Sequence, residues 1–80
     1  MKVEILCFAA LKDFFPIKQT IEIEFNFNVS QLKEFLGKQN PNAVKVLNVS
    51  RVSINQRIVK EAEIIPENAI IAILPPSSGG

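Results

Sequence analysis

The residues of this sequence best suited to chemistry are its last two, Gly79 and Gly80, which are two of only three glycines among 80 residues. A terminal Gly-Gly has no Cβ atoms and wide backbone freedom, and its α-carboxylate has no side chain beside it. Such a tail can enter a narrow channel in another protein and present its carboxylate there. We therefore expect the α-carboxylate of Gly80 to be the reactive group. The alternative is a frayed terminus that happens to contain glycine.

The residues before the glycines suit a tail that projects from a folded body. Pro75 and Pro76 directly follow the apolar run 69–74. Because proline has no N–H group to give to a strand ladder, the pair should end a strand and begin a stiff extended segment. Ser77 and Ser78 then form a short polar spacer.

Size and composition indicate one folded domain, which we expect to span residues 1–74, with a flexible tail over residues 75–80. The 80 residues are 48% hydrophobic, which is enough for a packed interior, and the net charge is only +1. The basic residues form no stripe, and Tyr and Trp are absent, so we expect no nucleic-acid partner. No apolar run is long enough to span a membrane, and we expect no membrane partner.

The sequence offers few side chains for catalysis. It contains no histidine and a single cysteine, Cys7, which excludes metal sites of the Cys/His type and nucleophiles activated by histidine. We therefore expect no metal and no bound cofactor. Strand alternation directs Cys7 into the core, where a free thiol behaves as a small hydrophobe. No disulfide can form within the chain, and we expect a reducing, cytoplasmic location.

Periodicity predicts the elements that must position the tail. Alternating apolar residues predict strands at 3–8, 20–25, 52–54, 58–59 and 69–74, and a short helical turn at 9–15. In the second strand Ile21, Ile23 and Phe25 should face the core. Tight turns are expected at Asn55-Gln56 and at Pro66-Glu67-Asn68.

Two helices are expected between the second and third strands. Asn28 can cap the first of them, with Gln31 three residues further on as in a capping box, and Gly37 lies near its end. Its apolar stripe consists of Val29, Leu32, Phe35 and Leu36. The second helix should begin at Pro41. Its inward-facing residues should be Ala43, Val44 and Leu47.

This order of elements predicts an α+β fold, in which a mixed sheet with its first and last strands at the centre packs on one main helix. The covered face should be supplied by Val3, Ile5, Cys7, Ile71 and Ile73. The opposite face then carries Leu6, Phe8, Ala72 and Leu74. An apolar patch without cover from its own chain usually marks a partner site. The alternatives are a wrong assignment of faces and cover by a loop.

Several segments resemble the small subunit of molybdopterin synthase, a ubiquitin-like protein of the β-grasp fold. They are Cys7-Phe8-Ala9-Ala10-Leu11-Lys12, Ile54-Asn55-Gln56, Pro66-Glu67-Asn68 and the ending Leu74-Pro75-Pro76-Ser77-Ser78-Gly79-Gly80. The likeness runs over essentially the whole chain, and the Pro-Pro-x-x-Gly-Gly ending is its most specific part. The resemblance implies a β-grasp fold for this chain.

The resemblance also implies a sulfur carrier that has no catalytic residues of its own. In that family a ubiquitin-activating-like adenylyltransferase uses ATP to adenylate the terminal glycine, here Gly80, and a sulfur donor protein converts the adenylate into a thiocarboxylate. The tail then enters the large subunit of the synthase, a heterotetramer, where its sulfur passes to a pterin precursor of the molybdenum cofactor. Family partner contacts carry over to Phe8, Ile58 and Leu74. Lys12 matches a usually basic position, which suits either an ion pair across the interface or an ordinary solvated lysine.

Other functions remain open at this point. A sulfur carrier of the thiamin pathway also ends in Gly-Gly, although it is usually shorter between its first two strands and lacks the Pro-Pro neck. A ubiquitin-like protein modifier, joined to target lysines through Gly80, shares every step up to the adenylate. A plain interaction module would bind its partner equally well without Gly79 and Gly80.

Overall fold

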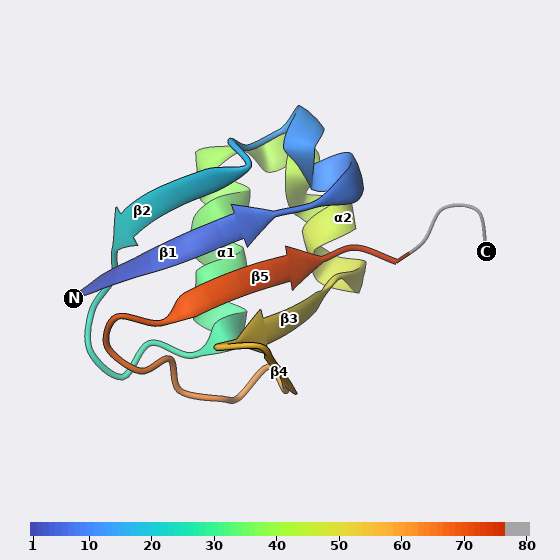
Figure 1. Ribbon diagram of the computed structural model, residues 1–80. Helices are drawn as coiled ribbons and strands as arrows, with labels where there is room; N and C mark the ends of the chain where they lie inside the picture. The colour runs from blue at the N-terminus through green and yellow to red at the C-terminus, as the bar shows by residue number, and fades with distance from the viewer. Residues whose placement is uncertain (77–80) are drawn as a thin grey trace.

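The computed structural model describes residues 1–76 of the chain (Figure 1). Its strands are β1 (Lys2–Cys7), β2 (Lys18–Glu22), β3 (Arg51–Ile54), β4 (Arg57–Val59) and β5 (Ile70–Leu74). Its α-helices are α1 (Val29–Gln39) and α2 (Val44–Val49), and its 3₁₀ helices are η1 (Ala9–Asp13) and η2 (Pro41–Ala43). The predicted α+β class is confirmed.

The strands form one mixed sheet in the order β2-β1-β5-β3-β4. The first and last strands, β1 and β5, lie side by side and parallel, whereas the other neighbouring strands are antiparallel (Figure 1). The prediction that these two strands occupy the centre of the sheet is therefore correct.

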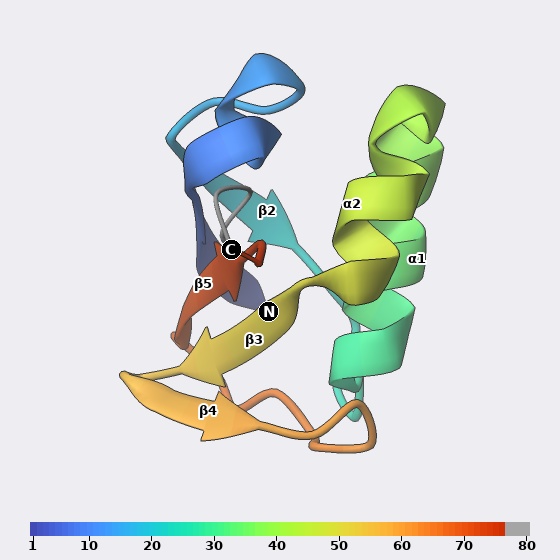
Figure 2. The ribbon, with the colours of Figure 1, turned by 90° about the vertical axis from the view of Figure 1, so that its right-hand side faces the viewer.

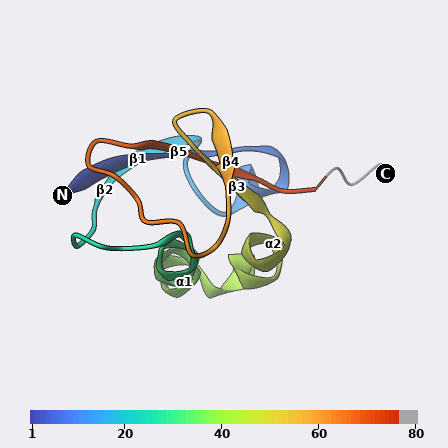
Figure 3. The same ribbon diagram turned by 90° about the horizontal axis from the view of Figure 1, so that it is seen from below.

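Both α-helices lie on one side of the sheet, so the molecule has two layers (Figure 3). The core between the layers is apolar, and its fully enclosed side chains include Ile5, Leu32, Leu36, Leu47 and Ile71. The covered face is supplied by the residues that alternation predicted: Val3, Ile5, Cys7, Ile71 and Ile73. Within residues 1–76 no helix lies over the opposite face of the sheet, which we call the outer face (Figure 3).

The start and end of α1 follow from local sequence. The Gln31 backbone N–H donates to Asn28 Oδ1 at 2.8 Å, and the Asn28 N–H donates to Gln31 Oε1 at 2.8 Å, which is the predicted capping box. The helix continues through Gly37 and ends at Gln39. A Cβ atom on Gly37 would lie 3.1 Å from Val44 Cγ2, so the missing side chain lets α2 approach α1 closely.

Two apolar residues that were expected to be buried are exposed. The second strand ends at Glu22, and Phe25 lies in a turn where it is 67% exposed, because the chain leaves the sheet there to reach α1. The next residue, Asn26, has a left-handed backbone with φ 66°. Val44 is 39% exposed, since it faces the groove beside Gly37 and not the sheet.

The turn between β3 and β4 consists of Asn55 and Gln56, as predicted. Both residues have left-handed backbones, with φ 50° and 71°, which suits a two-residue hairpin. The Ile70 N–H donates to Asn55 Oδ1 at 3.0 Å, and the Asn55 N–H donates to the Ile70 carbonyl at 2.9 Å. The hairpin is thereby tied to the first residue of β5.

Candidate functional site

The tail begins where the central strand β5 ends. Pro75 is half-buried and Pro76 is exposed, and both directly follow Leu74, the last residue of the strand. The predicted neck therefore starts at the edge of the domain. The predicted reactive end of the tail lies outside the described residues: Ser77, Ser78, Gly79 and Gly80. The role of the Gly80 carboxylate stays a prediction.

The strand register shows which side chains share the outer face. One row crosses all five strands, through Lys18 (β2), Leu6 (β1), Ala72 (β5), Ser53 (β3) and Ile58 (β4). Residues directly opposite one another on neighbouring strands point to the same side of a sheet. Along their own strands, the residues on either side of Leu6, Ser53 and Ala72 are buried in the core. Because side chains alternate along a strand, this row must face outward.

The structure brings the predicted apolar partner contacts to this same face. Leu74 is two residues beyond Ala72 and therefore points the same way. Phe8 extends β1 by one residue with φ −122° and ψ 165°, so alternation from the buried Cys7 places its side chain outward. Phe8 is 41% exposed and Ile58 is 53% exposed, whereas Leu74 is half-buried.

Ile70 adds an apolar side chain that sequence reasoning did not assign to this face. It lies opposite Glu4 of β1 and is 48% exposed. Strict alternation from the buried Ile71 would have assigned it correctly. Together these side chains form what we call the outer-face patch: Leu6, Phe8, Ile58, Ile70, Ala72 and Leu74.

Two ion pairs lie at the β1–β2 margin of the sheet. Lys18 Nζ lies 3.4 Å from Glu4 Oε1, and the Met1 ammonium lies 3.6 Å from Glu22 Oε2. Lys12, the predicted basic contact, is exposed in the last turn of η1 at the end of the domain where β1 and β5 finish. It makes no ion pair with any carboxylate of residues 1–76.

Cys7 is fully enclosed in the core, as predicted. Burial raises the pKa of its thiol because desolvation disfavours the thiolate. At neutral pH the group is therefore a protonated thiol without access to solvent, which is unsuited to sulfur relay.

We expect Cys7 to be inert to a soluble thiol reagent in the folded protein and to react fully once the chain is unfolded. The physical reason is its enclosure together with its raised pKa, which keep the thiolate population small. Labelling measured by mass spectrometry with and without denaturant checks this. Rapid labelling of the folded protein would show that the thiol is accessible and would contradict its assignment to the core.

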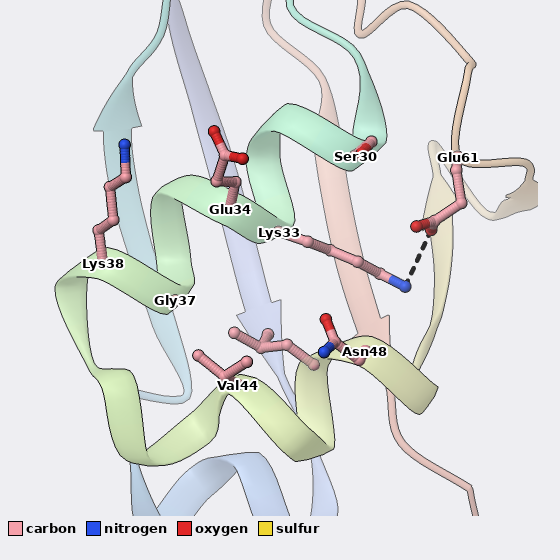
Figure 4. Close-up of a pocket in the computed structure, with 9 residues that line it drawn as sticks. Ser30, Lys33, Glu34, Gly37, Lys38, Val44, Asn48 and Glu61 are labelled. Carbon is pink, nitrogen blue, oxygen red and sulfur yellow. Dashed lines mark ion pairs between the residues drawn. The ribbon is translucent and has the colours of Figure 1, made fainter.

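A separate cavity of about 360 Å³ lies between α1 and α2, and none of the predicted site residues lines it. In Figure 4 the Lys33 side chain extends across it toward Glu61. The Lys33 ammonium lies 2.9 Å from Glu61 Oε2 and donates to the Ser50 carbonyl at 2.8 Å. The buried charge thus has two partners, and it connects α1 to the segment after β4 and to the residue before β3.

We expect Lys33→Ala to lower the free energy of unfolding by about 1–3 kcal/mol, because it leaves the Ser50 carbonyl without its donor. Glu61→Gln should cost less, since the Glu61 side chain is 62% exposed and an amide oxygen can still accept from Lys33. Urea unfolding followed by circular dichroism measures both values. Equal, negligible losses would show that this lysine does not connect the elements.

The described part of the chain, residues 1–76, has no group of three or more His, Cys, Asp or Glu side chains placed to hold a metal ion. None of its helices is both long and apolar enough to cross a membrane.

Comparison with known proteins identifies a family and several solved structures with a similar fold. The model of the ThiS family matches residues 5–80. SAMP1 from Haloferax volcanii is 19% identical, with a TM-score of 0.84 and 100% of each chain covered. A putative molybdopterin converting factor subunit 1 from Pyrococcus furiosus is also 19% identical, with a TM-score of 0.84 and coverage of 95% of this chain and 98% of that one.

A third similar structure is a complex of subunits 1 and 2 of the molybdopterin-converting factor from Helicobacter pylori 26695. It is 22% identical, with a TM-score of 0.72 and 100% of each chain covered. At such identities these likenesses establish the fold, and they confirm the predicted ubiquitin-like β-grasp.

Proposed function

The chain belongs to the ThiS family of ubiquitin-like sulfur carriers, and we propose that it is the sulfur carrier subunit of a molybdopterin synthase. The family match carries the sulfur-carrier part of the proposal, because it extends over residues 5–80 and so includes the Gly-Gly tail. The Pro75-Pro76 neck favours the molybdopterin branch by resemblance. The Helicobacter pylori complex of subunits 1 and 2 supports a large-subunit partner.

In the proposed cycle Gly80 supplies the reactive carboxylate and its partners supply the catalytic groups. A carboxylate oxygen attacks the α-phosphorus of ATP on an adenylyltransferase, and pyrophosphate leaves. Sulfur from a donor protein, at the oxidation level of sulfide, attacks the acyl carbon and displaces AMP, which leaves a thiocarboxylate. Its sulfur then attacks a carbon of a pterin precursor in the large subunit and displaces an oxygen group from that carbon. Water hydrolyses the resulting thioester, which leaves the sulfur on the precursor and returns the carboxylate to Gly80. We place this cycle in the cytoplasm, where ATP and reduced thiols are available.

The outer-face patch has a specific part in this cycle. Leu74 belongs to the patch and is also the last residue before the neck, so the docking surface and the root of the tail adjoin. A partner that covers Phe8, Ile58 and Leu74 therefore receives the tail from a fixed position. Orientation of this kind removes much of the entropic cost of bringing a reactive end to a distant active site.

Reconstitution tests the proposal. The purified chain is combined with the adenylyltransferase, the sulfur donor and the synthase large subunit of the same organism, together with ATP and the pterin precursor. We expect dithiolene formation that requires every component. Delivery of sulfur to a thiazole-forming enzyme of the thiamin pathway, with none to the large subunit, would contradict the molybdopterin assignment and favour the thiamin branch.

SAMP1 is a small archaeal modifier protein, and the similarity to it favours a protein modifier as a second candidate function. In that case Gly80 would form an isopeptide bond with a target lysine. Lys60 is the last basic residue of the sequence, so trypsin would leave residues 61–80 attached to the target. Peptides with this branch, sought by mass spectrometry in the host proteome, would support the modifier, whereas the sulfur carrier alone predicts none.

A further inference from the structure

Arg51 lies on the outer face beside the root of the tail. It is the first residue of β3 and stands opposite Leu74 of β5, so both side chains point to the same side of the sheet. Arg51 is exposed. Because Leu74 directly precedes the neck, Arg51 stands next to the point where the tail leaves the domain.

The positive charge of Arg51 has no carboxylate within ion-pair distance among residues 1–76. The carboxylates at the other margin of the outer face, on Glu4 and Glu22, are already paired with Lys18 and with the Met1 ammonium. Beside the root of the tail, the outer face therefore carries a positive charge that pairs with no carboxylate of residues 1–76.

A second exposed cation, Lys12, belongs to the same end of the domain. In Figure 2, which looks toward the end of β5, that strand finishes between η1 on one side and β3 on the other. Lys12 belongs to η1 and Arg51 to β3. The strand before the neck accordingly ends between two elements that each carry an exposed basic residue.

We infer that Arg51 is a specificity-determining contact, and that the protein receiving the tail presents an acidic side chain to it on the β3 side of its channel. The inference rests on the proposed function, because it requires a partner that docks on the outer face. Covering the outer-face patch removes water from the Arg51 guanidinium as well. That loss is unfavourable unless a carboxylate meets the group, and a planar guanidinium can hold a carboxylate through two parallel hydrogen bonds.

The contact discriminates between partners more than it adds affinity. A protein with a neutral or basic rim at this position would leave the Arg51 charge desolvated and unpaired, or would repel it. A protein with an acidic rim is attracted before contact, which raises the association rate in a salt-dependent way.

The test measures dissociation constants for the synthase large subunit of the same organism by calorimetry at two salt concentrations. The variants are Arg51→Ala, Arg51→Glu and, as a matched control, Arg57→Glu. Arg57 is also exposed, but it stands opposite the buried Ile54 and therefore points to the helix side of the sheet. Both glutamate variants change the net charge equally, so a difference between them reports position on the surface.

We expect Arg51→Glu to weaken binding by at least about tenfold, since like charges facing each other across an interface cost several kcal/mol. Arg51→Ala should weaken it less and should reduce the salt dependence, and Arg57→Glu should bind like the wild type. Melting temperatures establish that all variants are folded.

Wild-type affinity of Arg51→Glu would overturn the inference, and so would equal weakening by Arg51→Glu and Arg57→Glu. If Phe8→Asp nevertheless abolishes binding in the same experiment, only the role of Arg51 is wrong, and docking through the outer-face patch still holds. If the wild-type chain does not bind the large subunit at all, the proposed function fails and the inference fails with it.

Discussion

Deletion of Gly80 should abolish sulfur transfer while leaving the melting temperature nearly unchanged. The deletion leaves the terminal carboxylate one residue short of the position from which we propose that it reacts in a partner's channel. Among residues 1–76 the buried apolar residues end at Ile73, so we expect folding to be independent of Gly80. Single-turnover transfer to the large subunit and thermal unfolding measure the two quantities.

Two further tail variants separate the carboxylate from tail length and composition. One extra residue after Gly80 should block transfer, because it moves the carboxylate and adds a Cβ atom. Gly79→Ala should impair adenylation more than folding for the same steric reason. Ser78→Ala keeps the two glycines and is the matched control with near wild-type transfer. Wild-type transfer from an extended chain that has not been cleaved would contradict the assignment.

Phe8→Asp should weaken the complex with the large subunit by about 2–4 kcal/mol, which is more than tenfold in affinity. Loss of an apolar anchor and burial of a carboxylate at the interface both contribute. The melting temperature of the isolated chain should fall little, because Phe8 is already 41% exposed. Ile58→Asp should behave in the same way. Because Ile58 is 53% exposed, this substitution should disturb the folded domain least among the variants of the patch. Leu74→Asp should also weaken binding, although this side chain is half-buried.

Substitutions on the covered face provide the crossed control. Ile5 and Leu36 are both fully buried, so Ile5→Asp or Leu36→Asp places an unpaired charge in the core and should unfold the domain. Melting temperature and partner affinity are measured for both sets of variants. If Phe8→Asp unfolds the chain as severely as Ile5→Asp, the outer-face patch is part of the core and the docking surface lies elsewhere.

Local sequence signals predicted most of the fold. The capping box at Asn28 and Gln31 and the alternation in β1 and β5 depend on neighbouring residues, and each appears in the structure. Errors arose where the path of the chain decides burial. Phe25 continues the alternation of its strand, yet the chain turns there to reach α1. The true start of β2 at Lys18 lacked an apolar signal, because the first residues of this edge strand are polar.

The candidate site was also predictable in part from the sequence. Parity along β1 and β5 assigned Phe8 and Leu74 to one face, and the ending itself identified the tail. The arrangement of charges at this end of the domain could not be predicted from the sequence, because an ion pair depends on which residues far apart in the sequence lie close together in the fold. Lys33 illustrates this limit, since its position in α1 gives no sign that Ser50 and Glu61 enclose its ammonium group.

Intact-mass analysis of the protein isolated from its own host tests the central claim most directly. A sulfur carrier predicts a population in which one sulfur replaces one oxygen in the C-terminal carboxyl group of Gly80. This population should disappear from a strain that lacks the adenylyltransferase. The contrary result is that the strain with the adenylyltransferase yields only the carboxylate form, together with chains linked through Gly80 to lysines of other proteins. That result would contradict the sulfur-carrier account and would identify the chain as a protein modifier.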